Sequence, residues 1–256
     1  MNKNISYEQA EILYENKKFV QALEMFKELE TAETDPYIQN YIGCCLLKLR
    51  QYSEAQQIFE VLVFENNDWA RPVYNLGRVY MEQNMLENAL MCFDKALSID
   101  PYDADSYYYR GVYFEKTEDS DNTILNYKIA VSFKPDEFEF HVGLCNCYDY
   151  IGDVHNALTE ARKAFELFDC NDTLYNYTYL LNKTHNFEQV YDLLQSHDVI
   201  AYDDVGLLKN FMFCLKKLKK NSLCLKCAKI ILEKTPEDCF AISIVDQLSG
   251  QSASND

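Results

Sequence analysis

The chain has 256 residues with a formal net charge of −17, and 48% of its residues are hydrophobic. With seven glycines and five prolines, the composition suits a helical protein with short turns and leaves no long linker. The acidic balance argues against nucleic acid or an anionic membrane as the main partner, because phosphate would be repelled over most of the surface. A neutral or basic partner is favoured, although an acidic surface can also serve merely to keep a large apolar body in solution.

A pattern of paired helices repeats along the chain in seven copies, at intervals of 33 or 34 residues. The copies occupy residues 3–35, 36–69, 70–103, 104–137, 138–170, 171–204 and 205–238. One position of the pattern holds Phe26, Phe59, Phe93, Tyr127, Ala161, Leu194 and Ala228 in turn. Each helix pair leaves an apolar face that only the next pair can bury, so the copies are expected to stack.

The first copy is predicted to begin with Ser6 as a helix cap, followed by helices over Tyr7 to Glu15 and Phe19 to Glu30. The second copy ends at Trp69, the single tryptophan of the chain. We interpret this side chain as a packing residue between copies in preference to a platform for a ligand.

The third copy is the clearest. Gly77 on its first helix and Ala89 on its second are small, so the two backbones can approach closely while Phe93 fills the space beside them. In the sixth copy, His197 stands where the pattern has a small residue, which predicts looser packing there.

The third copy also carries a resemblance to a known family. Its characteristic positions hold Leu76, Gly77, Tyr80, Ala89, Phe93, Ala96 and Pro101. On these residues the chain resembles the tetratricopeptide repeat (TPR) family, whose period is about 34 residues. The resemblance implies an all-α, right-handed superhelix, or α-solenoid, of about seven helix-turn-helix repeats. A single domain over residues 3–249 is expected, with a capping helix at 239–249 and a disordered tail at 250–256.

In TPR proteins the first helix of each repeat lines a concave groove, so the resemblance also implies a set of groove residues. These candidates are Asn40, Tyr41, Cys44, Arg71, Tyr74, Asn75, Arg78, Tyr108, Tyr109, Asn146, Tyr175 and Tyr179. Tyrosine and asparagine combine a large contact area with hydrogen bonding, which suits an extended peptide or a partner helix. The alternative is that a tyrosine packs against the neighbouring first helix, and we assign roughly half of the tyrosines to each role.

Members of the family that hold a C-terminal carboxylate use a fixed set of Lys, Asn and Arg positions across three repeats. This chain lacks that set in register, so a carboxylate-clamp co-chaperone is not expected. Arg71 and Arg78 are a candidate local anion site, because a guanidinium can grip a carboxylate through two hydrogen bonds. Surrounding acids can instead neutralise both arginines.

A second candidate surface lies in the seventh copy. Residues 205–232 contain seven lysines and no Asp or Glu. The candidate basic patch consists of Lys209, Lys216, Lys217, Lys219 and Lys220. It can attract nucleic acid, an acidic surface or the acidic end of a second copy of the chain. The alternative is a solvated lysine turn between two helices.

Signals for metal binding, disulfides or catalysis are weak. Cys224 and Cys227 have metal-like spacing, but zinc needs two further ligands and Cys224 already occupies a small core position. The four histidines fall in different copies, with no nucleophile, zinc or phosphate-loop motif beside them. We therefore predict free structural cysteines, no metal, no cofactor and no enzymatic activity.

The start of the chain, MNKNISYEQAE, lacks the apolar segment of a signal peptide, and no apolar run is long enough to span a membrane. These features predict a cytoplasmic protein that does not engage a membrane. The sequence favours a TPR scaffold that binds a protein or peptide segment in its groove. The alternative is binding of nucleic acid or an acidic surface, or head-to-tail self-association, through the lysines of the seventh copy.

Overall fold

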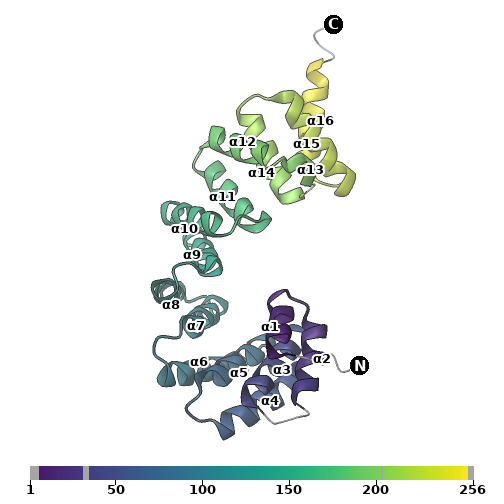
Figure 1. Ribbon diagram of the computed structural model, residues 1–256. Coiled ribbons are helices and arrows are strands. Elements are labelled where there is room, and N and C mark those ends of the chain that lie inside the picture. Colours follow the sequence, from purple (N-terminus) through teal and green to yellow (C-terminus); the bar gives the residue numbers. More distant parts are fainter. Residues whose placement is uncertain (1–5, 31–34, 203, 253–256) are drawn as a thin grey trace, which may run out of the picture. The chain divides into compact units, whose positions relative to one another are not determined.

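The computed structural model of the chain describes residues 6–30, 35–202 and 204–252. No strand occurs within those ranges, and the predicted all-α fold is confirmed (Figure 1). The first eight helices are α1 (Tyr7–Glu15), α2 (Phe19–Glu30), α3 (Pro36–Lys48), α4 (Tyr52–Glu65), α5 (Ala70–Glu82), α6 (Leu86–Ile99), α7 (Ala104–Lys116) and α8 (Ser120–Phe133). The following helices are α9 (Phe138–Tyr150), α10 (Val154–Leu167), α11 (Asn171–Lys183), α12 (Phe187–Ser196), α13 (Val199–Tyr202), α14 (Val205–Lys217), α15 (Asn221–Lys234) and α16 (Cys239–Ser252).

These helices fall into two compact units, Met1–Lys134 with α1 to α8 and Pro135–Asp256 with α9 to α16. Within each unit every helix packs against the helix that follows it, so each unit is a stack of helical hairpins. A single domain through all seven copies stays a prediction. The expected capping helix corresponds to α16, which reaches Ser252, and residues 253–256 of the expected tail lie outside the described residues.

Aspartates begin many of the helices. The side chains of Asp35, Asp103, Asp119, Asp153 and Asp204 each accept a hydrogen bond from a backbone N–H in the first turn that follows. Such caps satisfy N–H groups that have no partner within the helix, and the negative charge is favourable beside the helix N-terminus. Part of the net acidity of the chain therefore serves helix formation.

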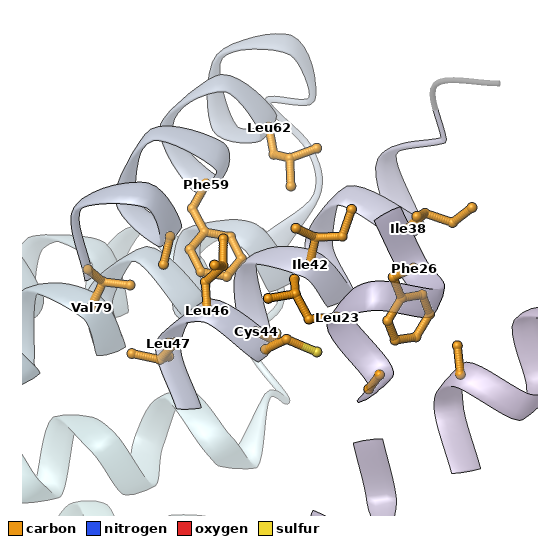
Figure 2. Close-up of a cluster of buried hydrophobic side chains, with 14 of the residues drawn as sticks. Leu23, Phe26, Ile38, Ile42, Cys44, Leu46, Leu47, Phe59, Leu62 and Val79 are labelled. Carbon is orange, nitrogen blue, oxygen red and sulfur yellow. The ribbon is translucent and has the colours of Figure 1, made fainter. Parts of the chain in front are cut away.

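The predicted fit of a small residue against a large one recurs through the first unit. The pairs are Gly43 with Phe59, Gly77 with Phe93 and Gly111 with Tyr127. A Cβ atom added at Gly77 would lie 2.6 Å from Cε1 of Phe93, so the ring occupies the space that a side chain would need. Phe93 itself is fully buried. Figure 2 shows the same packing one repeat earlier, where Phe59 and Leu46 lie among apolar side chains of neighbouring helices.

Each turn between the two helices of a repeat contains one residue with left-handed backbone. Gly152 has φ 80° and is the glycine of this set. The others, with φ between 57° and 64°, are Lys17, Arg50, Asn84, Glu118, His185 and Lys219. Left-handed backbone favours glycine because a Cβ atom crowds the following carbonyl, so most of these turns hold a less favourable residue.

The sixth copy departs from the regular hairpin at His197. Helix α12 ends at Ser196, and the His197 ring lies tilted against that of Phe165, with its Nε2 2.9 Å from Oδ2 of Asp169. The short helix α13 follows and buries Val199. The sequence predicted looser packing at His197, and the structure places this residue at the end of α12, just before the short helix α13.

The second unit contains one deeply buried ion pair. His141 on α9 is 3% exposed, and its Nδ1 lies 2.6 Å from Oε2 of Glu160 on α10. Its Nε2 lies 2.9 Å from the carbonyl oxygen of Pro135, and Lys163 donates to the other Glu160 oxygen at 3.1 Å. Burial alone would lower the pKa of His141, but hydrogen bonds to Glu160 and to the Pro135 carbonyl raise it above its usual value.

Candidate functional site

A hollow of about 540 Å³ lies in the first unit, along the helices that open its repeats. Its lining consists of Tyr7, Tyr14, Tyr37, Asn40, Tyr41, Cys44, Trp69, Arg71, Tyr74, Asn75, Arg78 and Asp105. Seven predicted groove residues are among them, namely Asn40, Tyr41, Cys44, Arg71, Tyr74, Asn75 and Arg78. We call this space the aromatic hollow, because tyrosine and tryptophan make up half of its lining.

The floor of the aromatic hollow is a hydrogen-bonded set of buried polar groups. Asn75 on α5 donates from Nδ2 to Oδ1 of Asn40 at 2.9 Å and to Sγ of Cys44 at 3.3 Å, both on α3. Asn75 is 1% exposed, so its amide chiefly joins two helices. Burial raises the pKa of the Cys44 thiol, which keeps this side chain protonated and neutral.

Arg78 reaches into the aromatic hollow from α5. Its Cζ atom lies 5.5 Å from the centre of the Tyr74 ring and 5.2 Å from that of Tyr109, distances typical of a cation–π contact. Its Nη1 donates to Oδ1 of Asn75 at 3.3 Å. Tyr109 is a predicted groove residue that does not line the hollow, and its ring packs against the guanidinium of Arg78.

Arg71 has different partners. Its Nη1 lies 3.3 Å from Oδ2 of Asp105, and its Nη2 lies 3.9 Å from Oδ1 of Asp103. Lys134 also donates to Oδ2 of Asp105 at 2.7 Å. The sequence left open whether acids neutralise the two arginines, and the geometry answers this for Arg71, whose charge is compensated.

Four aromatic side chains of the lining stand outside the twelve candidates given above, although Tyr37 occupies a groove position of the second repeat. They are Tyr7 and Tyr14 of α1, Tyr37 of α3 and Trp69 of the turn before α5. The ring centres of Tyr37 and Trp69, both of the second copy, are 4.8 Å apart, and Trp69 also borders the hollow. The packing of Trp69 between repeats stays a prediction. The signal for Tyr7 and Tyr14 was present, since the groove positions used for later repeats fall on these residues in the first repeat.

The remaining predicted groove residues lie elsewhere. Tyr108 stacks on Tyr127 with ring centres 5.2 Å apart, so it packs within its own repeat. Asn146, Tyr175 and Tyr179 belong to the second unit, where the two tyrosine rings stack at 6.2 Å and are each 39% exposed. None of these three residues belongs to the lining of the aromatic hollow.

Comparison with known proteins agrees with the hairpin architecture. Residues 77–117 match a family model described as a TPR repeat. The C-terminal part of a TPR repeat-containing protein from Cytophaga hutchinsonii has a TM-score of 0.64 at 18% identity, over 94% of this chain and 99% of that one. A thermophilic TPR protein of Thermus thermophilus has a TM-score of 0.62 at 21% identity, over 68% of this chain and 96% of that one.

Residues 77–117 thus match a TPR repeat, and the chain shares the fold of known TPR proteins. The predicted α-solenoid class is thereby confirmed. A curated relative, the UDP-N-acetylglucosamine–peptide N-acetylglucosaminyltransferase of Giardia intestinalis, is 22% identical over 143 residues. This match covers 56% of the TPR chain, which spans only 10% of the length of the transferase.

The predicted basic patch of the TPR chain lies on α14 and in the turn that follows it. Lys209 is paired, because its Nζ lies 2.6 Å from Oδ2 of Asp238. Lys216, Lys217 and Lys220 lie over the rings of Phe240, Phe213 and Tyr191 at 5.6, 5.4 and 4.1 Å. Lys219 is the left-handed residue of the turn.

The cysteines of the TPR chain are free thiols. Cys224 and Cys227 are both buried, and burial raises the pKa of the Cys227 thiol to about 12. In the described ranges, no three His, Cys, Asp or Glu side chains are placed to hold a metal ion together. None of the helices described there has the length and apolar character needed to cross a membrane.

Proposed function

We propose that this TPR protein is a cytoplasmic, non-catalytic scaffold that binds an extended segment of a partner protein in the aromatic hollow. TPR proteins are in general protein-interaction scaffolds, and the fold supports that class of function. The observation that carries the proposal is the aromatic lining on α1, α3 and α5. Rigid aromatic rings give a large contact area at a small cost in conformational entropy.

The size of the aromatic hollow fits a short stretch of peptide. Its volume of about 540 Å³ lies within the usual range of about 300–1,000 Å³ for ligand sites. Tyr37 is 62% exposed and Trp69 is half-buried, so their rings are accessible to a ligand. The net charge of −17 supports a partner segment that is neutral or basic overall.

A peptide-display selection tests this function. Random peptides of about 12 residues are selected on the full chain, and binding is then measured by the fluorescence of Trp69, the single tryptophan. Replacing Tyr37 with Ala should weaken the selected peptides about 10- to 100-fold, because aromatic anchors at the centre of an interface carry most of its free energy. Calorimetry can follow the same loss in a Trp69→Ala variant.

Tyr150→Ala is the matched control, since this tyrosine is 75% exposed and lies in the second unit. It should leave binding unchanged. Peptides that bind the Tyr37→Ala chain as tightly as the original chain would place the site outside the aromatic hollow.

The basic patch supports a second candidate, namely an acidic partner, nucleic acid or the acidic part of a second copy. Among the described residues, Lys209 is the patch lysine whose ammonium pairs with a carboxylate, so Lys216, Lys217 and Lys220 keep their charges available. Changing Lys216, Lys217, Lys219 and Lys220 to Glu should abolish any such binding. Binding to a single-stranded oligonucleotide should also fall between 50 and 200 mM salt, by about 50-fold for four lysine–phosphate contacts. Binding to a second copy should likewise weaken as salt screens the charges. The absence of binding at 50 mM salt would reject this candidate.

The transferase likeness does not alter the proposal. Its match spans a small part of that enzyme, so glycosyl transfer is not carried over to this chain. We retain the prediction that the chain is not an enzyme and needs no cofactor.

A further inference from the structure

The two arginines of the aromatic hollow differ in charge compensation. Arg71 is held by Asp103 and Asp105, as described above. Within the described part of the chain, no carboxylate lies within 4.0 Å of the Arg78 guanidinium, and no ion pair involves it. A guanidinium carries five N–H donors, whereas the hydrogen bond formed here, to Asn75, uses one nitrogen.

The protein holds this unpaired charge in a fixed place. Tyr74 is 5% exposed, and its ring meets that of Tyr109 edge-on with centres 5.6 Å apart. Both rings face the Arg78 guanidinium. The charge therefore rests on aromatic faces and on the buried Asn75 amide, which orient the guanidinium without neutralising it.

A second cation strengthens the local positive field. Desolvation, and then the charge of Arg78, lower the pKa of the Lys48 ammonium on α3, so these two cations repel each other. A chain of net charge −17 thus places an unpaired guanidinium in the lining of a cavity, with Lys48 nearby but outside that lining. An anion bound at Arg78 lowers the electrostatic free energy of the site, because it screens the repulsion between Arg78 and Lys48 and gives the guanidinium a partner.

We propose that the aromatic hollow recognises one carboxylate of the bound segment, which Arg78 receives through its free N–H groups. This inference rests on the proposed function and names the chemical group that the hollow selects. The rest of the segment can be neutral or basic, as the overall charge favours, with one acidic residue or a chain end at Arg78. The site differs from the co-chaperone clamp, whose positions in this chain hold other residue types.

The surroundings favour a carboxylate over a phosphate. Asp105 borders the same hollow, and Tyr41 of its wall donates to Oε1 of Glu11 at 2.8 Å. A single negative charge matches the one unpaired guanidinium in a two-pronged contact. A second negative charge on a phosphate would face these acids, and Lys48, the other cation near Arg78, is not among the residues that line the hollow.

Small probes test the site without a known partner. 3-Phenylpropionate carries a ring and one carboxylate, and 3-phenylpropionamide is its uncharged counterpart. Titration of the full chain with the acid should shift the NMR signal of the Arg78 Nε–H group and the fluorescence of Trp69. The amide should bind about tenfold more weakly, since it lacks the charge-assisted hydrogen bonds. Equal affinity for the acid and the amide would overturn the proposal.

Variants assign the effect to Arg78. Arg78→Met keeps much of the stem and removes the charge, and should abolish the preference for acid over amide. Arg78→Lys should retain part of it, because a lysine keeps the charge and loses the planar fork. Arg110→Met is the matched control, since Arg110 pairs with Asp94 at 3.1 Å and lies outside the hollow. Circular dichroism establishes that each variant is folded, and an unchanged preference in folded Arg78→Met would reject the proposal.

Peptides separate this proposal from the function on which it rests. In a peptide selected on the chain, each Asp or Glu is changed to Asn or Gln, and the C-terminus is amidated in a separate version. One of these changes should cost about tenfold in affinity for the original chain and nothing for Arg78→Met. The contrary result is a peptide that competes with 3-phenylpropionate and yet loses no affinity on any of these changes. That result would reject carboxylate recognition by Arg78 and leave the proposed binding of a segment in the hollow intact. Tighter binding of phenyl phosphate than of the acid would reject the choice of carboxylate over phosphate.

Discussion

Replacement of Phe93 with Ala should destabilise the first unit by about 3–5 kcal/mol, the usual cost of removing a fully buried phenylalanine. The Phe93 ring is 0% exposed and fills the space left by Gly77 on the facing helix. The loss combines the apolar surface returned to water with a cavity that two helices cannot close without moving. Urea unfolding followed by the fluorescence of Trp69 measures the effect, because this tryptophan lies in the same unit.

Gly77→Ala provides the complementary test of the same interlock. The added methyl group would meet Phe93 at 2.6 Å and Cβ of Cys92 at 3.0 Å, so overpacking should cost about 1–3 kcal/mol. In a Phe93→Leu background the methyl group has more room, and the same substitution should cost less. Strictly additive effects of the two changes would contradict direct contact between them.

Glu160→Gln should destabilise the second unit by about 3 kcal/mol, because it leaves His141 buried without the carboxylate that its charged form requires. Both groups of the pair are largely removed from water, with side-chain exposures of 3% and 13%. Hydrogen exchange of α9 and α10 measures local stability at these two helices.

The pH dependence follows from the directions of the two pKa shifts. Hydrogen bonds raise the pKa of His141 above its usual 6.5. The stability that this residue contributes to the folded unit is therefore fully present below pH 6.5 and is lost as the pH rises through the raised pKa. Burial opposes ionisation of Glu160, but hydrogen bonds from His141 and Lys163 lower its pKa below the usual 4.5. The stability that Glu160 contributes is therefore fully present above pH 4.5 and is lost as the pH falls through the lowered pKa.

The His141–Glu160 pair should therefore stabilise the second unit most strongly between about pH 4.5 and 6.5. Glu160→Gln should flatten the decline above neutral pH. His197, whose pKa is raised chiefly by its hydrogen bond to Asp169, accounts for the slope that remains. An unchanged pH profile in Glu160→Gln would show that the pair does not control it.

The fold was predictable from sequence because its determinants repeat. Gly77 and Phe93 belong to one copy of a pattern that recurs at fixed spacing, so each helix pair confirms the placement of the next. The sixth copy was harder, because the pattern shows that His197 is too large for its position without showing how the chain avoids the clash. The short helix α13, which follows His197, was not part of the predicted pattern.

The candidate site was predictable in position and less so in chemistry. Positions along the first helices led directly to Tyr41, Tyr74 and Arg78, whereas Trp69 lies just before α5, outside those positions. The difference between the two arginines could not be obtained from the residue pattern. Arg71 pairs with Asp103 at the end of its own repeat and with Asp105 at the start of the next, and the packing of the helices decides which acids reach which guanidinium.

The left-handed turns between paired helices have a practical consequence. Glycine in place of Lys17, Arg50, Glu118, His185 or Lys219 should relieve roughly 1 kcal/mol of backbone strain at each turn, less the entropy that glycine loses on folding. Because the turns are one repeat apart and share no contacts, these gains ought to accumulate. Successive glycine substitutions should therefore raise the melting temperature stepwise, and none of them changes a side chain that borders the hollow.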